Sequence, residues 1–221
     1  MTQHHVLEGD SIDFRYGDHS VLTGVYIKCE TGKVTGLLGR NGTGKSTLFN
    51  ILFGTASPGG GSVRWNSKYV RSAFRKNGLV SYMPQFPSIP GHLSFKKLLK
   101  LFGYDDDQVE EVLSYHLVKK HFTTRISNLS TGERKLLEAL LLLHSRSHFV
   151  LLDEPFSFLS PLQVEQLLPV VRSQARTKGI LLTDHRYQQV IDSSDTVLLL
   201  KNGSVHPIQG IDGLKSLGYI R

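Results

Sequence analysis

The residues best suited to chemistry lie in one short stretch of the chain. Residues 39–47 read GRNGTGKST, which fits the pattern G-x-x-x-x-G-K-[ST] of a phosphate-binding loop. Glycines let backbone N–H groups approach phosphates closely, Lys45 adds a positive charge for the β- and γ-phosphates, and the Ser46 hydroxyl can ligate Mg²⁺. An apolar stretch before the loop (34–38) and a helical pattern after it (46–53) give the strand–loop–helix context that the motif needs. The residues predicted to bind a nucleoside triphosphate here are Gly39, Asn41, Gly42, Thr43, Gly44, Lys45, Ser46 and Thr47.

Two further groups of polar residues follow apolar stretches. Residues 149–152 (FVLL) lead into Asp153 and Glu154, and residues 179–183 (GILLT) lead, after one residue, into His185. In parallel α/β sheets the carboxyl ends of strands carry the ligand-facing chemistry. Beside a phosphate loop, Asp153 is suited to hold Mg²⁺, Glu154 to orient or deprotonate water, and His185 to donate to a γ-phosphate. Taken alone, the acidic pair would more simply end its strand before a proline, and the histidine would be an ordinary loop residue. The histidines without such a context, expected on the surface, are His4, His5, His19, His144 and His148.

The composition is that of an ordinary globular chain with an excess of basic residues. Of the 221 residues, 39% are hydrophobic and 20% charged, which suits one substantial core or a core with a subdomain. No stretch approaches the roughly 18 uninterrupted apolar residues of a membrane span, and the N-terminus lacks a signal-peptide core. The single cysteine, Cys29, permits no internal disulfide, so a cytoplasmic setting is expected. The net charge of +7 would suit nucleic acid, anionic lipid or an acidic protein, but the simpler expectation is a generally basic surface.

Hydrophobic patterning predicts an antiparallel opening followed by alternating strands and helices. Strands are expected at residues 5–15, 21–29, 34–38, 62–66, 79–83, 149–153, 179–183, 196–201 and 205–208. Helices are expected at residues 46–53, 94–102, 105–113, 129–145 and 162–175. The predicted fold class is α/β, with a P-loop NTPase core around a mostly parallel sheet, an N-terminal antiparallel β-subdomain and an inserted helical subdomain. One domain spanning 1–221 is expected, with 1–85 and 146–221 forming the core and 86–145 the helical subdomain.

Nearly the whole chain, from about Val6 to Gln209, resembles the ATP-binding cassette (ABC) ATPases, because the motifs of that family occur in the family's order. Tyr16 resembles the aromatic that stacks on adenine, and Gln85 resembles the glutamine of the Q-loop, which reaches the metal and the attacking water. Residues 129–133 (LSTGE) resemble the family signature, usually Leu-Ser-Gly-Gly-Gln. The acidic pair and His185 match the family's Walker B aspartate, catalytic glutamate and switch histidine.

Three residues depart from the family pattern. Thr131 and Glu133 replace a glycine and a glutamine of the signature, while Ser130 and Gly132 remain available to a γ-phosphate. A threonine disfavours the left-handed backbone that glycine adopts, and a glutamate brings negative charge toward a triphosphate. Ser160 replaces the aspartate of the D-loop, which in the family links the two halves of a dimer, so communication between sites is expected to differ.

The resemblance implies an ATP-hydrolysing subunit of a transporter that uses ATP and Mg²⁺. Two cassettes, expected to be copies of this chain, would close head to tail around ATP, with the signature of one completing the site of the other. Separate transmembrane subunits would be the partners, which places the chain peripherally on the cytoplasmic face of the membrane. Two alternatives remain: a non-transport ATPase of the same superfamily acting on nucleic acid or ribosomes, which the sequence favours less, or a weakly hydrolysing regulatory nucleotide-binding subunit. The transported substrate and the direction of transport are not encoded in any motif.

Overall fold

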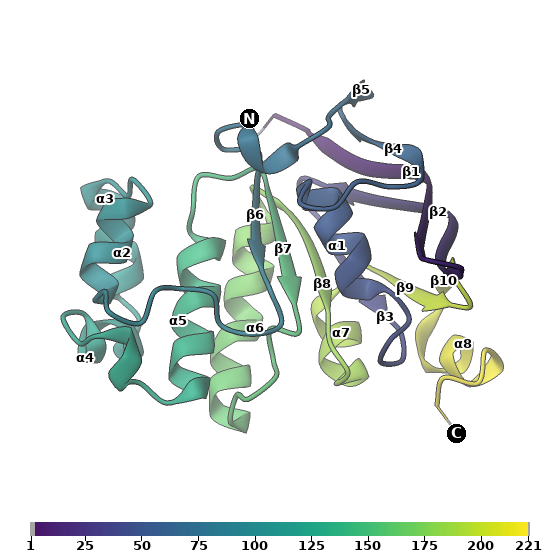
Figure 1. Ribbon diagram of the computed structural model, residues 1–221. Coiled ribbons are helices and arrows are strands. Elements are labelled where there is room, and N and C mark those ends of the chain that lie inside the picture. Colours follow the sequence, from purple (N-terminus) through teal and green to yellow (C-terminus); the bar gives the residue numbers. More distant parts are fainter. Residues whose placement is uncertain (1–2, 221) are drawn as a thin grey trace.

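A four-stranded antiparallel sheet opens the fold (Figure 1). The computed structural model describes residues 3–220. The strand order of this sheet is β2-β1-β4-β5, and every neighbouring pair is antiparallel. The bounds are β1 (Val6–Tyr16), β2 (His19–Glu30), β4 (Gly60–Trp65) and β5 (Lys68–Tyr69). The predicted antiparallel opening is therefore confirmed, and β4 brings a later segment of the chain into the same sheet.

The second sheet has six strands in the order β10-β9-β3-β8-β7-β6 and is parallel except for β10. The bounds are β3 (Val34–Leu38), β6 (Val80–Met83), β7 (Phe149–Asp153), β8 (Gly179–Thr183), β9 (Thr196–Lys201) and β10 (Ser204–Ile208). All residues of β3, β7 and β8 are buried, as continuous apolar runs in a parallel sheet covered on both faces require. These three central strands run in the same direction, so the residues that follow them meet at one edge of the sheet.

Helices cover both faces of the parallel sheet. Their bounds are α1 (Lys45–Phe53), α2 (Phe95–Leu101), α3 (Asp106–Leu113), α4 (His116–His121), α5 (Thr131–Leu143), α6 (Pro161–Ala175), α7 (Tyr187–Ser193) and α8 (Gly210–Ser216). Single 3₁₀ turns lie at Ala73–Arg75 and Ile126–Asn128. In Figure 1 α2, α3 and α4 stand at one side of the molecule, next to α5. The helices predicted within 46–175 are confirmed, and the short α4, α7 and α8 are additions.

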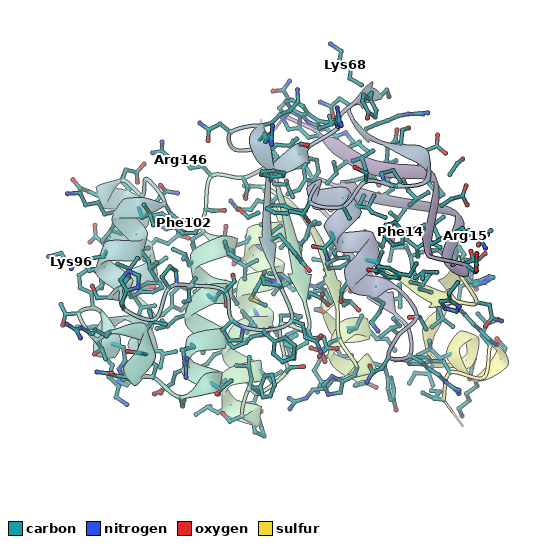
Figure 2. The ribbon with its side chains drawn as sticks, viewed as in Figure 1. Phe14, Arg15, Lys68, Lys96, Phe102 and Arg146 are labelled. Carbon is teal, nitrogen blue, oxygen red and sulfur yellow. The ribbon has the colours of Figure 1, made fainter. Side chains whose placement is uncertain are left out.

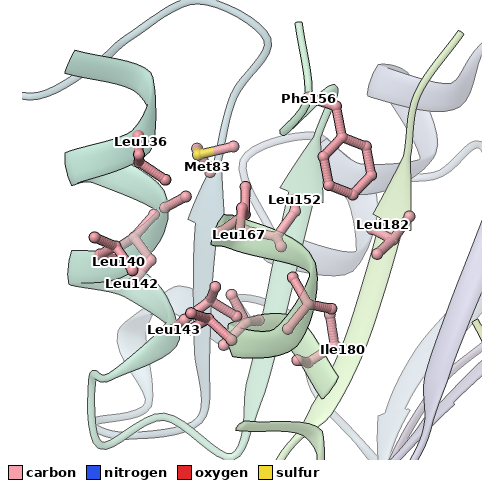
Figure 3. Close-up of a cluster of buried hydrophobic side chains, with 14 of the residues drawn as sticks. Met83, Leu136, Leu140, Leu142, Leu143, Leu152, Phe156, Leu167, Ile180 and Leu182 are labelled. Carbon is pink, nitrogen blue, oxygen red and sulfur yellow. The ribbon is translucent and has the colours of Figure 1, made fainter. Parts of the chain in front are cut away.

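Alternate residues of the central strands feed two hydrophobic cores. Leu152 and Ile180 belong to the core beneath α5 and α6, where they lie near Leu140 and Leu167 (Figure 3). Neighbours such as Leu151 point the other way, into the core that α1 shares with the antiparallel sheet. Cys29 belongs to this second core, with 1% of its surface exposed, and burial raises the pKa of its thiol.

Four helices begin with side chains that satisfy free backbone N–H groups. Ser94 caps α2 and Asp105 caps α3, at the first residues of the helices predicted at 94–102 and 105–113. Ser130 and Ser160 cap α5 and α6, each within a capping box closed by the residue three positions later. Ser160 therefore has a structural role at the position where the ABC pattern has aspartate.

The expectation that the unassigned histidines lie on the surface is wrong for two of them. His5 is 5% exposed, and its ring centroid lies 4.2 Å from that of His148. His144 is 3% exposed, with Nδ1 3.2 Å from a carboxylate oxygen of Glu111 and Nε2 3.1 Å from the hydroxyl of Tyr115. Because each of its ring nitrogens has a polar partner, the imidazole of His144 is tolerated inside the protein.

The segment between Glu30 and Asp105 contains lysines and arginines but no aspartate or glutamate, so it is strongly basic. Two of them are exposed far apart on the molecule: Lys68, the first residue of β5, at the top of Figure 2, and Lys96 on α2 at its left edge. Among residues 3–220, none of the helices has both the length and the apolar character needed to cross a membrane.

Candidate active site

The predicted phosphate loop joins β3 to α1 at the carboxyl edge of the parallel sheet. Gly42 and Gly44 have φ angles of 80° and 103°, a left-handed backbone that glycine adopts readily and other residues do not. Gly44 is the N-cap of α1, and the helix begins at Lys45. The loop therefore presents the free N–H groups and positive dipole end of a helix N-terminus, which together favour an anion.

The side chain of Lys45 is held in place by backbone carbonyl groups of the phosphate loop. Its Nζ donates to the carbonyl oxygens of Gly39 at 2.8 Å and Arg40 at 3.1 Å. Burial lowers the pKa of Lys45, while the charges of Glu154 and Asp153 act in the opposite direction. An ammonium group is thus positioned at the phosphate loop with two acidic side chains nearby.

A cavity of about 460 Å³ opens in front of the loop. Its walls are formed by Tyr16, His19, Val21, Asn41, Gly42, Gly44, Lys45, Ser46, Thr47, Gln85 and Glu154. Segments from β1, the phosphate loop and the end of β6 therefore meet at one place, although they are far apart in the sequence. Tyr16 is 63% exposed, and its ring makes an edge contact with Phe14 at 4.9 Å between centroids. His19 and Val21 were missed by the sequence analysis, and His19 is exposed as predicted but lines the cavity.

Asp153 lies beneath the phosphate loop at the end of β7, with 1% of its surface exposed. Burial raises the pKa of its carboxyl group, and hydrogen bonds from Ser46 and Tyr82 oppose that rise. The Tyr82 hydroxyl donates to Oδ2 at 3.3 Å. A hydroxyl and a carboxylate are the oxygen ligands that Mg²⁺ prefers, so Ser46 and Asp153 could hold this cation together with phosphate oxygens. Within residues 3–220 no cluster of three or more acidic, histidine or cysteine side chains could hold a metal ion by itself.

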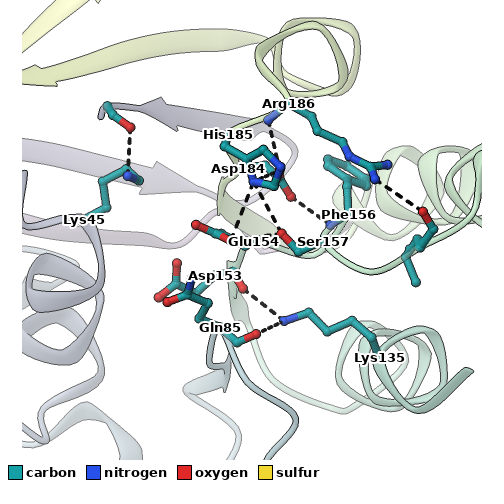
Figure 4. Close-up of polar contacts among 12 residues, drawn as sticks. Lys45, Gln85, Lys135, Asp153, Glu154, Phe156, Ser157, Asp184, His185 and Arg186 are labelled. Atoms are coloured by element: carbon teal, nitrogen blue, oxygen red, sulfur yellow. Dashed lines mark hydrogen bonds and ion pairs between the residues drawn. The ribbon is translucent and has the colours of Figure 1, made fainter. Parts of the chain in front are cut away.

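Glu154 projects from a strained backbone, with a φ angle of 54°. Its Oε2 accepts a hydrogen bond from the Ser157 hydroxyl at 2.9 Å and lies 3.7 Å from Nδ1 of His185 (Figure 4). Asp184, which directly precedes His185, also contacts the histidine ring. Asp184, fully buried, accepts from the backbone N–H of Phe156 at 2.9 Å and lies 3.2 Å from the same Nδ1. The loops after β7 and β8 are thereby joined, which brings the predicted glutamate and histidine together.

The signature residues lie outside this cavity, at the N-terminus of α5. Ser130 donates its hydroxyl and its backbone N–H to a carboxylate oxygen of Glu133, and these bonds lower the pKa of Glu133. A Cβ added to Gly132 would lie 2.7 Å from the carbonyl oxygen of Phe158, so the helix packs closely on the loop after β7. Thr131 is the first residue of α5 and is not among the residues with positive φ, so its Cβ causes no conflict with a left-handed backbone.

Comparison with known proteins places the chain in a family. Residues 22–157 match the family model described as ABC transporter. The chain belongs to the ABC transporter family. This ABC transporter chain is 29% identical over 212 residues to the lipopolysaccharide export system ATP-binding protein LptB of Acidithiobacillus ferridurans, covering 90% of the chain and 88% of the relative. It is 26% identical over 214 residues to the high-affinity branched-chain amino acid transport ATP-binding protein BraG of Pseudomonas aeruginosa, covering 90% and 91%.

A solved structure supports the same assignment at the level of the fold. The structure of an ATP binding subunit of an ABC transporter superposes with a TM-score of 0.84 at 23% identity, covering 96% of this chain and 93% of the other. The predicted fold class is confirmed. ABC transporter ATP-binding proteins are ATPases, and this chain is accordingly an ATP-binding ATPase of that family.

Proposed function

We propose that this ABC transporter chain hydrolyses ATP to drive substrate translocation by separate membrane-spanning subunits. The observation that supports this most is the single cavity shared by the phosphate loop, Gln85 and Glu154, with Asp153 directly beneath it. These groups can bind a triphosphate, position a divalent cation and place a carboxylate at the γ-phosphate side of the loop.

Each side chain has a role that follows from its position. Lys45 and the loop N–H groups bind the β- and γ-phosphates, and Tyr16 at the edge of the cavity stacks on adenine. Ser46, Asp153 and Gln85 would hold Mg²⁺, which when bound would offset the negative charge of the phosphates.

Glu154 orients or deprotonates the attacking water, because its carboxylate faces the cavity and is held by Ser157. His185, more than half exposed beside Glu154, donates to the γ-phosphate. The proton taken from water and the charge that develops on the phosphate are thus handled by neighbouring groups.

A second copy of the chain completes the site. Ser130 and Gly132 do not line the cavity of their own chain. The Ser130 hydroxyl would have to exchange its bond to Glu133 for one to a γ-phosphate. In a head-to-tail dimer the signature of one copy would meet the phosphate loop of the other. ATP would then bind between the two chains, and its cleavage would weaken their contact.

The segment that follows Gln85 and connects the core to the helical subdomain would contact the membrane partners. Gln85 lies two residues after the end of β6, and the residues that follow it lead into α2. We propose that residues 86–145 act as a helical subdomain beside the core formed by 1–85 and 146–221. This arrangement would place the chain peripherally on the cytoplasmic face of the membrane, where motion of the subdomain reaches the transmembrane subunits.

The decisive experiment compares the wild-type chain with Glu154→Gln. The wild type should hydrolyse ATP with Mg²⁺, while the variant should bind ATP with similar affinity, lose at least 100-fold in kcat, and elute as a dimer with ATP in size-exclusion chromatography. Lys45→Met is the matched control, because it should lose ATP binding itself. Equal turnover by the wild type and Glu154→Gln would refute the assignment of Glu154.

A further inference from the structure

A buried lysine on α5 contacts two of the segments that supply the active site, those at the ends of β6 and β7. Lys135 has no measurable exposed surface, and its Nζ donates to the backbone carbonyl oxygens of Pro84, at 3.1 Å, and of Gln85 (Figure 4). The same Nζ lies 3.4 Å from the carbonyl oxygen of Asp153, at the end of β7. An ammonium group has three N–H donors, so these three carbonyl groups use its full capacity.

A second side chain on the same face of α5 holds the other end of the loop after β6. Glu138 lies three residues after Lys135, which places the two side chains next to each other on the helix. It is fully buried, and it accepts hydrogen bonds from the Ser88 backbone N–H at 3.0 Å and the Ser88 hydroxyl at 2.6 Å. Residues 84–88 are therefore fixed to α5 at both ends, with the Gln85 side chain between them facing the cavity.

Removing a charged side chain from water is costly unless the charge has close partners. The positions flanking Lys135 and Glu138 include Leu136, Leu137 and Ala139, so an apolar residue would suit this part of α5 well. Burial lowers the pKa of Lys135, and the first opposing charge is that of Glu138. A lysine and a glutamate kept here at such cost, bonded to one catalytic loop, indicate a positioning role beyond packing.

We propose that Lys135 and Glu138 form a clamp that fixes Gln85 to the signature helix, so that a displacement of Ser130 by the partner's ATP is passed to the Gln85 loop of the same chain. This inference rests on the proposed function. Lys135 follows Ser130 by five residues, a distance of about 7.5 Å along a rigid helix. Lys135 and Glu138 are positioning residues, because they reach the site through the backbone of residues 84–88 and Asp153.

The clamp offers a connection that does not involve the D-loop aspartate, which is Ser160 in this chain. The Ser160 hydroxyl caps α6, accepting from the backbone N–H of Gln163 at 3.3 Å. Its position is thus used for helix capping, whereas Lys135 joins the signature helix to β7 and to the Gln85 loop directly.

The test compares Lys135→Met with Lys178→Met in the full chain. Lys178 is also a buried lysine bonded to backbone carbonyl groups, those of Ser145 and Ser147, but it lies before β8 and away from the cavity. Lys135→Met should lower kcat at least tenfold while KM for ATP changes less than threefold. Lys178→Met should lose stability to a similar extent with kcat within twofold of the wild type. A loss of kcat no greater in Lys135→Met than in Lys178→Met would overturn the proposal.

A double-mutant comparison separates a positioning role from a general loss of structure. If Lys135 acts through Gln85, the combination of Lys135→Met with Gln85→Ala should be no slower than Gln85→Ala alone. Effects that multiply would show that Lys135 acts independently of Gln85 and would contradict the clamp.

Hydrogen exchange provides a readout that does not depend on turnover. The backbone amides of Phe86 and Ser88 should exchange at least tenfold faster in Lys135→Met than in the wild type, and at the wild-type rate in Lys178→Met. Ser88→Ala, an exposed substitution that leaves the core intact, should raise exchange there at least threefold. Unchanged exchange in both Lys135→Met and Ser88→Ala would overturn the clamp. If the wild type failed to hydrolyse ATP while these exchange differences held, the proposed function would fail and the structural link would stand.

Discussion

The hydrogen bond between Ser157 and Glu154 offers a quantitative test of how the glutamate is held. Ser157→Ala removes a donor to a carboxylate oxygen at 2.9 Å, and both residues are at most 9% exposed. A hydrogen bond to a charged group contributes about 1.5–3 kcal/mol. Taking about 2 kcal/mol, and about 2–4 °C of Tm per kcal/mol for a chain of this size, the melting temperature should fall by about 4–8 °C.

The same substitution should reduce activity, because the Glu154 carboxylate gains freedom to rotate away from the attacking water. We expect kcat to fall about tenfold, equivalent to about 1.4 kcal/mol, measured as steady-state phosphate release with saturating ATP and Mg²⁺. Ser94→Ala is the control: it removes a helix cap worth about 1 kcal/mol far from the cavity and should leave kcat unchanged. A Ser157→Ala protein with a lowered Tm but wild-type kcat would refute the idea that this bond orients Glu154.

Two other substitutions test the start of β3 and the phosphate loop that follows this strand. The Asp195 carboxylate accepts hydrogen bonds from the Val34 N–H at 2.7 Å and from Arg172 at 2.8 Å. Burial alone would raise the pKa of Asp195, but these hydrogen bonds have the larger combined effect, so its pKa is lowered. Asp195→Asn should cost about 1 kcal/mol above about pH 5, and this difference should shrink as the pH falls below the ordinary aspartate value of 3.8. A urea-unfolding difference that is unchanged between pH 7 and about pH 2.5 would contradict this sign. Gly44→Ala puts a Cβ 2.6 Å from Val21 Cγ1 at a φ of 103°, so the ATP dissociation constant should rise at least tenfold in a nucleotide titration, and wild-type affinity would exclude the proposed loop geometry.

Much of the fold was predictable because its signals are local. The fully buried strands β3, β7 and β8 appear in the sequence as short apolar runs, and the P-loop pattern specifies both its own backbone and the elements on either side. Helix caps such as Ser94 and Asp105 are equally local, since the capping side chain and its partner are three residues apart. The short α4 has no capping side chain and only six residues, and for that reason no pattern predicted it.

The parts of the site that escaped prediction depend on contacts between distant residues. Tyr82 reaches Asp153 across 71 positions, and Lys135 reaches Gln85 across 50. Neither pair forms a pattern in a single sequence, because the register of β6 against β7 and the packing of α5 bring them together. Ser157 could have been suspected from its position three residues after Glu154, but the left-handed backbone of Glu154 could not.

The buried Cys29 makes this chain well suited to site-specific labelling. It is the only cysteine, it lies in the core beneath the antiparallel sheet, and its thiol resists ionisation. A maleimide reagent should therefore not react with the folded wild-type protein. A cysteine introduced on α2 or near the signature would then carry a single probe, with no labelling of Cys29. Cys29 itself would be modified only when the core opens, so the rate of its modification would report the rate at which the wild-type chain unfolds.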